Sequence, residues 1–491
     1  MPPPKPAAQS VEFGDFQTPA ALAREACESL RDRGVAPAAV VEPTCGVGNF
    51  LLAALDGFPT LKIGLGVEIH EGHVGIARSR LRERSDAAKV TIRRESFFNV
   101  DWPGVLRDLP EPLLVVGNPP WVTNAAIGAV GGSNLPRKSN LQRFSGLDAL
   151  TGKSNFDISE WMLVKLLEAL GGRRATLAML CKTAVARKVL AHAWRNGISM
   201  IDAEIHPIDA AAAFGAAVGA CLLICRLAPD AQSRDCRVFR RLGDAAPAAT
   251  IGHRDGQLIA DVTAHERWKH LSGEGTHTWR SGVKHDCARV MELRREGGLC
   301  RNGFGEAVEL ERDYLYPMLK GSEIAGGRSE RPTRWMLVPQ KSMREDTSII
   351  RDVAPKTWEY LQRWADRLDR RASSIYRNRP RFSIFGVGAY TFAPWKIAIS
   401  GFYKKLHFAA VGPYEGRPVV LDDTSYFLAC RSEPEARFVA DLLNSEPARA
   451  FFSAFVFWDA KRPITIDLLR RLDLSALARE LGVSPALEAP R

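Results

Sequence analysis

The sequence predicts a two-domain protein of the α/β class, in which a seven-stranded, doubly wound parallel sheet is followed by a mixed α+β domain. The 491 residues exceed what one compact core holds. In the first half, short apolar runs alternate with stretches that carry apolar residues at helical spacing. After about residue 227 this alternation stops. We therefore expect a first domain over residues 11–238 and a second over 239–480, with a disordered lead (1–10) and a tail (481–491).

Seven apolar runs are expected to form the strands. They cover residues 38–43, 62–69, 89–96, 113–118, 174–181, 199–207 and 219–227. Runs such as LLVVGN are apolar at almost every position, as in strands that are covered on both faces. The last two runs are close together in the sequence, so they can form an antiparallel pair at one edge of the sheet.

Helices are expected between these strands. Apolar residues recur at helical spacing over residues 49–55, 72–85, 158–170 and 185–197, and the last two stretches end at glycines. Near the N-terminus, Thr18 is placed as an N-cap and Pro19 as the first residue of a helix that continues to about Arg33.

The overall composition narrows the classes of function. The net charge is +11, which suits a polyanionic partner such as nucleic acid, although a basic solvated surface would give the same number. The nine cysteines form no CxxC pair or disulfide framework, so we expect no metal site and free thiols in a reducing cytoplasm. Neither a signal peptide nor a membrane span is visible in the sequence, which favours a cytoplasmic protein that is not bound to a membrane.

The stretch EPTCGVGNFL joins the end of the first strand to the first helix of the sheet. Gly46 and Gly48 allow a tight turn and a close approach to a ligand. Glu68 ends the next strand, where an acidic side chain accepts both hydroxyls of a ribose. Each feature alone is compatible with a purely structural turn or a surface carboxylate, but together they predict a nucleoside site.

The expected cofactor is S-adenosylmethionine. The sequence has no GxxxxGK[ST] stretch, so hydrolysis of a nucleotide triphosphate is not supported. A nucleoside without a pyrophosphate is the simpler ligand, and S-adenosylmethionine is such a nucleoside. The helix that begins near Thr18 would present free N–H groups to its methionine carboxylate.

The tetrapeptide Asn118-Pro119-Pro120-Trp121 follows the fourth strand, at the edge where doubly wound sheets bind ligands. The exocyclic amine of a nucleobase is a poor nucleophile because its lone pair is delocalised into the ring. The Asn118 side-chain carbonyl and the Pro119 backbone carbonyl can accept its two N–H groups, and the prolines hold these oxygens rigidly. Trp121 offers a ring face to a stacked base. The structural alternative is a turn over a core tryptophan.

Together these motifs resemble the gamma-type, adenine-specific DNA methyltransferases. FQTP, EPTCGVGNF, the strand-end Glu68 and NPPW occur in the order and spacing of that family, and the resemblance covers about residues 11–227. It implies a Rossmann-like methyltransferase domain followed by a target-recognition domain.

The resemblance also implies roles for single residues. Thr18 matches the threonine that helps to hold the methionine carboxylate, and Glu42 matches the acidic residue near the methionine ammonium. The other implied cofactor residues are Gly46, Gly48 and Glu68, and the implied catalytic tetrapeptide is Asn118, Pro119, Pro120 and Trp121. Phe214 matches an aromatic that packs on the flipped base, although an ordinary core phenylalanine explains it equally well.

One position departs from the family pattern. The family usually carries an Asp before the Phe that follows the third strand, where it reads the cofactor's adenine amine. Here Ser96 precedes Phe97 and therefore takes that position.

The implied function is a site-specific DNA methyltransferase that acts on adenine in double-stranded DNA. It would belong to a restriction–modification system, with a cognate restriction endonuclease as partner. An RNA or protein-glutamine methyltransferase with the same tetrapeptide is an alternative, and so is a non-catalytic DNA-binding subunit.

Three segments combine cations with glycines or aromatics and are expected to meet DNA. Residues 122–156 contain Arg137, Lys138, Arg143 and Lys153, although a mobile surface insertion would look the same. Residues 370–382 and 401–408 interleave Arg and Lys with Tyr and Phe, whereas a merely solvated charge run would not need those rings.

Overall fold

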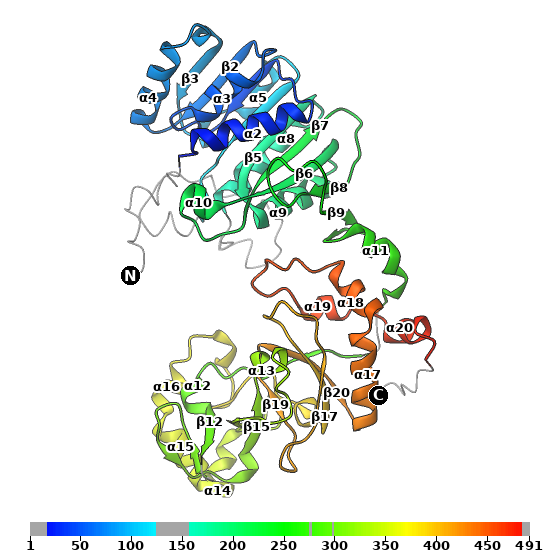
Figure 1. Cartoon of the computed structure of the whole chain (residues 1–491). Coiled ribbons are helices and arrows are strands. Elements are labelled where there is room, and N and C mark those ends of the chain that lie inside the picture. The colour runs from blue at the N-terminus through cyan, green and yellow to red at the C-terminus, as the bar shows by residue number, and fades with distance from the viewer. Residues whose placement is uncertain (1–16, 124–156, 274–276, 297–298, 484–491) are drawn as a thin grey trace. The chain divides into compact units, whose positions relative to one another are not determined.

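A computed structural model describes residues 17–123, 157–273, 277–296 and 299–483. The chain divides into two compact units, the first ending at Val262 and the second beginning at Thr263 (Figure 1).

The first unit contains a ten-stranded sheet in the order β10-β9-β8-β6-β7-β5-β4-β1-β2-β3. Its strands are β1 (Ala39–Glu42), β2 (Ile63–Glu68), β3 (Val90–Arg94), β4 (Leu113–Gly117), β5 (Ala175–Lys182), β6 (Met200–Ile208), β7 (Ala220–Leu227), β8 (Asp235–Val238), β9 (Ala249–Arg254) and β10 (Gln257–Ile259). Strands β1 to β5 are all parallel, as the alternating pattern predicts. The doubly wound α/β class is therefore confirmed.

The sheet differs from the prediction at its far side. β6 and β7 pair antiparallel, as expected, but β7 lies between β5 and β6, and neither strand is an edge. β8 pairs parallel with β6 and brings the fully buried Cys236 into the sheet. β9 and β10 follow by antiparallel pairing. The predicted boundary after residue 238 thus lies within the sheet, and the compact unit continues to Val262.

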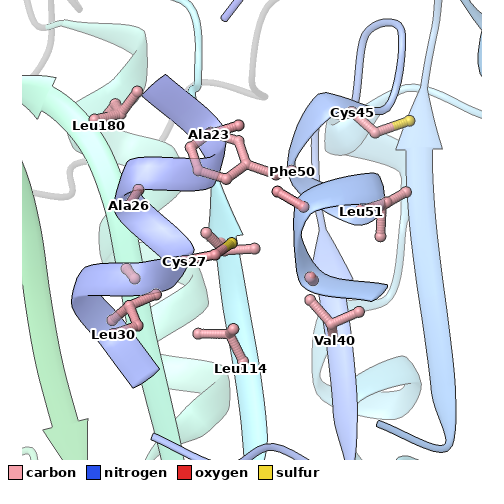
Figure 2. Close-up of a cluster of buried hydrophobic side chains, with 14 of the residues drawn as sticks. Ala23, Ala26, Cys27, Leu30, Val40, Cys45, Phe50, Leu51, Leu114 and Leu180 are labelled. Atoms are coloured by element: carbon pink, nitrogen blue, oxygen red, sulfur yellow. The ribbon is translucent and has the colours of Figure 1, made fainter. Parts of the chain in front are cut away.

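Helices cover both faces of this sheet. They are α2 (Ala20–Asp32), α3 (Asn49–Gly57), α4 (Glu71–Arg82), α5 (Trp102–Arg107), α8 (Ile158–Leu170), α9 (Thr183–Arg195) and α10 (Ala210–Phe214). In Figure 2, α2 and α3 lie side by side over β1, β4 and β5, with the small residues Ala23, Ala26 and Cys27 within the buried cluster. The alternate strand residues Val41 and Val115 are equally buried, as a sheet covered on both faces requires.

The start of α2 corrects one prediction. The N-cap is Pro19 rather than Thr18, and no side chain caps this helix. Because Pro19 adopts an extended backbone conformation, the helical hydrogen bonding begins one residue later than the sequence pattern indicates.

The second unit is a mixed α+β structure, as predicted. One sheet has the order β14-β13-β12-β16-β15-β19 and the other β11-β20-β17-β18. The strands are β11 (Arg280–Ser281), β12 (Glu292–Glu296), β13 (Leu299–Arg301), β14 (Ala307–Val308), β15 (Leu315–Leu319), β16 (Arg334–Leu337), β17 (Trp395–Ser400), β18 (Ala409–Val411), β19 (Val420–Leu421) and β20 (Ser425–Cys430). The helices are α11 (Val262–Trp268), α12 (Ala288–Met291), α13 (Gly321–Ala325), α14 (Ile350–Val353), α15 (Pro355–Arg363), α16 (Ala365–Asp369), α17 (Glu433–Asn444), α18 (Glu446–Ser453), α19 (Ile466–Leu469) and α20 (Leu474–Glu480).

Candidate functional site

The candidate site lies where the winding of the first sheet reverses. β1 has β2 as its neighbour on one side and β4 on the other, and all three strands run parallel. Their carboxyl ends therefore meet at one edge, which is where open α/β sheets bind ligands. Glu42 ends β1, Glu68 ends β2 and Asn118 follows β4. Topology thus brings together three of the predicted site residues.

The glycine loop is bound directly to the predicted ribose acceptor. The Gly46 N–H donates to Glu68 Oε2 at 2.8 Å, and the His70 N–H donates to Glu68 Oε1 at 2.7 Å. Each carboxylate oxygen has a second lone pair, so the same group can still accept a hydroxyl. The carboxylate is therefore oriented before any ligand arrives.

Both loop glycines have positive φ angles, +50° at Gly46 and +82° at Gly48. A Cβ at Gly46 would lie 2.3 Å from the Gln17 side-chain oxygen, which accepts from the Val47 N–H at 3.1 Å. Any larger residue at position 46 would therefore be strained and would displace Gln17. Gln17 belongs to the FQTP stretch, in which the sequence pattern predicts no role for it.

Thr18 is linked to the same loop. The Asn49 side-chain amide donates to the Thr18 carbonyl at 2.6 Å, and Arg80 donates to the Asn49 side-chain oxygen at 2.7 Å. These bonds hold the start of α2 beside the start of α3. The Thr18 backbone thus lies beside Asn49, which follows the glycine loop.

Glu42 is a buried carboxyl group. It is 3% exposed and accepts from the Leu51 N–H at 3.2 Å. Burial, with a further contribution from the charge of Glu68, raises the pKa of Glu42 well above its ordinary value. No cation pairs with Glu42 among the residues that the structure describes. A buried carboxyl of this kind fits the ammonium group of a ligand.

The Asn118 tetrapeptide is fastened to the glycine loop. The Thr44 hydroxyl lies 3.4 Å from the Asn118 backbone carbonyl, with donor geometry toward it. Asn118 is half-buried and Pro119 is buried. The cofactor motif and the proposed amine-binding motif therefore adjoin each other.

Trp121 and Phe214 come together although 93 positions separate them. Their ring centroids are 5.1 Å apart in an edge-to-face arrangement. The Trp121 indole N–H donates to the Leu180 carbonyl at 3.3 Å, and the residue is only 8% exposed. Trp121 is thus also a core residue, whereas Phe214 is half-buried.

A lysine that the sequence reasoning missed holds the tetrapeptide in place. Lys182, at the end of β5, donates to the Trp121 backbone carbonyl at 2.9 Å and to Asp157 Oδ2 at 2.6 Å. Asp157 is the N-cap of α8, and its backbone pairs with that of Thr123 in an isolated antiparallel β-bridge. We call Lys182, Asp157 and the Trp121 carbonyl the lysine brace. A lysine at a strand end has no distinctive spacing, so only the fold reveals it.

Ser96 follows β3 and caps a short 3₁₀ turn, where its hydroxyl accepts from the Phe98 N–H at 3.3 Å. The residue before it adjoins the end of β2, because the Glu95 N–H donates to the Glu68 carbonyl at 3.0 Å. Ser96 thus lies at the same sheet edge as the other predicted cofactor residues, with its hydroxyl engaged in the turn.

The residues that the structure describes contain no cluster of three or more potential metal ligands. None of the helices among them has the length and apolar character needed to cross a bilayer. Arg137, Lys138, Arg143 and Lys153, predicted to meet phosphates, lie outside the described residues.

Comparison with known proteins places the chain in a family. No family model matches the sequence. The chain is 45% identical over 470 residues to the type II methyltransferase M.NspV of Nostoc sp., and the match covers 96% of this chain and 98% of that protein. It is 28% identical over 160 residues to the type II methyltransferase M.VspI of Vibrio sp., with coverage of 32% and 35%.

The fold is similar to that of the type IIL restriction-modification enzyme MmeI, solved in complex with DNA. The TM-score is 0.51 at 15% identity, and the likeness covers 93% of this chain but 64% of the MmeI chain. The family is shown by the match to M.NspV, which covers nearly the full length of both chains. This chain belongs to the type II methyltransferases of restriction–modification systems, and S-adenosylmethionine is its methyl donor.

Proposed function

We propose that the protein methylates the exocyclic amine of adenine at a specific sequence in double-stranded DNA. The family supports methyl transfer, and the choice of adenine rests on the residue at position 118. Asn before two prolines is typical of enzymes that act on the adenine amine, whereas Ser is more typical of those that act on cytosine. The RNA and protein-glutamine alternatives would require a departure from the family of M.NspV.

The proposed cofactor contacts follow from the strand ends. Glu42 pairs with the methionine ammonium, because it is a buried carboxyl without a cation among the described residues. Glu68 accepts the ribose hydroxyls, because the backbone N–H groups of Gly46 and His70 already orient it. The cofactor supplies an electrophilic methyl group on a sulfonium. The Thr18 region, next to the glycine loop, receives the methionine carboxylate.

The observation that carries the proposal is the placement of Asn118 next to this loop, with Thr44 directed at its backbone carbonyl. The Asn118 side-chain carbonyl and the Pro119 carbonyl accept the two N–H groups of the amine, which localises its lone pair for attack on the methyl group. The new N–C bond forms as the S–C bond breaks, and the amine proton then leaves to water. Catalysis on this scheme consists of positioning and electrostatics.

The target base has to leave the duplex to reach Asn118. We assign its stacking surface to the pair of Trp121 and Phe214, whose rings are 5.1 Å apart. Phe214 is the more exposed of the two, so it offers the accessible face, while Trp121 supports it edge-on from the core.

We assign target recognition to the second unit. Of its two cationic segments, residues 370–382 and 401–408, only the second has exposed aromatic rings. In residues 370–382, Phe382 is a core residue, and Arg371 donates to the backbone carbonyls of Leu368 and Ser383, so this segment is largely structural. In residues 401–408, Phe402 and Tyr403 are exposed large rings. Lys404 and Lys405 beside them are also exposed. Exposed rings next to lysines suit contact with bases and phosphates.

The test is direct. The full chain is incubated with S-adenosylmethionine labelled in its methyl group and with duplex DNA, which is then digested to nucleosides for mass spectrometry. We expect labelled N6-methyladenine, and an Asn118→Ala variant that still binds cofactor should lose at least about 100-fold in transfer rate. Label on cytosine alone, or on RNA or protein alone, would overturn the proposal. Single-molecule sequencing of the product then gives the recognition sequence, which a cognate endonuclease is expected to share.

A further inference from the structure

Three arginines lie side by side across the larger sheet of the second unit. Arg294 of β12 is directly opposite Arg301 of β13 and directly opposite Arg334 of β16. Residues that are directly opposite in antiparallel strands point to the same face. With neighbouring strands about 4.8 Å apart, the three Cα atoms form a row roughly 10 Å long. We call Arg301, Arg294 and Arg334 the arginine row; its strands belong to the sheet labelled β12 and β15 in Figure 1.

The row lines a hollow of about 530 Å³. Its lining holds five cationic side chains against two carboxylates. The cations are Arg289, Arg294, Arg301, Lys320 and Arg334, and the carboxylates are Glu292 and Glu296. Like charges directly opposite each other on a sheet destabilise it, so such a row has an unfavourable energy unless an anion lies against it.

The two carboxylates leave the middle of the row, Arg294, without a paired charge. Glu292 is engaged by Lys320 at 2.6 Å and by His285 at 3.2 Å, and Arg334 reaches it only at 3.9 Å. Burial raises the pKa of Glu292, but hydrogen bonds from His285 and Lys320 hold that pKa below its ordinary value. The negative charge of Glu292 therefore interacts mainly with these two partners.

Arg294 is the centre of the row and is the least satisfied member. It is exposed, and no carboxylate pairs with it among the residues that the structure describes. Arg301 pairs with Glu296 at 3.2 Å. The Nε atom of Arg334 is buried and finds no hydrogen-bond partner in the described part of the chain. Arg294 therefore retains exposed donors for a ligand, and the buried Nε atom of Arg334 beside it lacks an acceptor among the described residues.

We propose that the arginine row binds the phosphodiester backbone of DNA and positions the duplex on the second unit. The inference rests on the proposed function, because it takes the polyanion to be the DNA substrate. Guanidinium groups bind phosphate oxygens through paired N–H donors, so arginines gathered in one row suit a polyanionic backbone. Contacts of this kind give affinity and register but read no base.

The experiment measures DNA binding by the full chain at several salt concentrations, with the specific duplex and a scrambled one. Arg294→Gln should weaken binding to both duplexes roughly tenfold at low salt. It should also lower the slope of log affinity against log salt by about 0.9, the value for one lost phosphate contact. Arg294→Lys should restore most of the slope. The thermal midpoint of Arg294→Gln should be unchanged or higher, because a like-charge contact is removed.

A matched control separates this effect from a general loss of charge. Arg437→Gln removes one exposed arginine from α17 of the same unit, where Arg437 pairs with Glu433. This variant should keep the wild-type salt slope. An Arg294→Gln slope equal to that of wild type, or equal to that of the control variant, would overturn the proposal.

The outcomes also separate this inference from the proposed function. Wild-type transfer to cytosine in place of adenine would overturn the adenine assignment and leave the arginine row intact. Normal adenine methylation, with unaltered DNA binding by Arg294→Gln, would overturn only the role of the row.

Discussion

At the scale of single residues, Glu42 makes a prediction about pH. Burial and the charge of Glu68 raise its pKa well above the ordinary 4.5 for a glutamate, so its carboxyl stays neutral to a higher pH than that of an exposed glutamate. A neutral carboxyl cannot pair with an ammonium group. Affinity for S-adenosylmethionine should therefore rise with pH as Glu42 ionises, by about tenfold per pH unit below its pKa, and fall again as the cofactor's own amine deprotonates near pH 8.

Titration calorimetry across this pH range checks the prediction. In the acidic limb, where affinity rises with pH, Glu42 should release one proton for each cofactor bound. Glu42→Gln cannot ionise, so it should bind more weakly at the optimum and lose the acidic limb. An acidic limb that persists unchanged in the variant would assign the ionisation to another group and remove Glu42 from the ammonium site.

At the scale of elements, the lysine brace joins the end of β5, the N-terminus of α8 and the tetrapeptide loop. Lys182→Met keeps the length of the side chain but removes both bonds. Because misplacement by about 1 Å can cost about 100-fold in rate, kcat for methyl transfer should fall roughly 10- to 100-fold. Cofactor affinity should stay close to wild type, since the hydrogen bonds that Glu42, Glu68 and Thr18 make with their neighbours do not involve Lys182.

Steady-state kinetics and cofactor titration together separate positioning from misfolding. Lys182→Met also leaves Asp157 buried without its cation, which should lower the free energy of unfolding by about 1–3 kcal/mol. The double variant with Asp157→Asn removes that buried charge and should recover stability but not kcat. A wild-type kcat in Lys182→Met would exclude a positioning role for the brace.

At the scale of the whole molecule, the two compact units predict a division of labour. A fragment of residues 1–262 keeps the complete ten-stranded sheet and every proposed cofactor contact. We expect it to bind S-adenosylmethionine as the full chain does, and to lose tight, sequence-specific DNA binding. A fragment that ends at Pro229 would leave the edge of β6 without β8 and should aggregate or unfold at a lower temperature.

Calorimetry with cofactor and fluorescence anisotropy with specific and scrambled duplexes check both halves of this prediction. The full chain serves as the reference, and its DNA affinity should fall steeply with salt. A 1–262 fragment that distinguishes the two duplexes as well as the full chain does would place target recognition in the first unit.

The sequence alone determined the alternation of strands and helices that makes the parallel part of the sheet, and the sheet edge at which the candidate site residues lie. Strand periodicity and turn chemistry are local properties. Glu68 ends a recognisable strand, Asn118 directly follows another, and Gly46 lies in the turn after a third. Parallel winding then brings such strand ends to one edge without further information. The family resemblance added roles for these residues, and the match to M.NspV confirmed the family.

Only the tertiary structure decided the contacts that depend on pairing between distant segments. The insertion of β7 between β5 and β6, the addition of β8, and the meeting of Trp121 with Phe214 have no local pattern in the sequence. The lysine brace and the arginine row arise in the same way, because a lysine at a strand end or an arginine in a short strand acquires its neighbours from strand register. Register is set by packing over the whole unit, so these neighbours become visible only once the chain is folded.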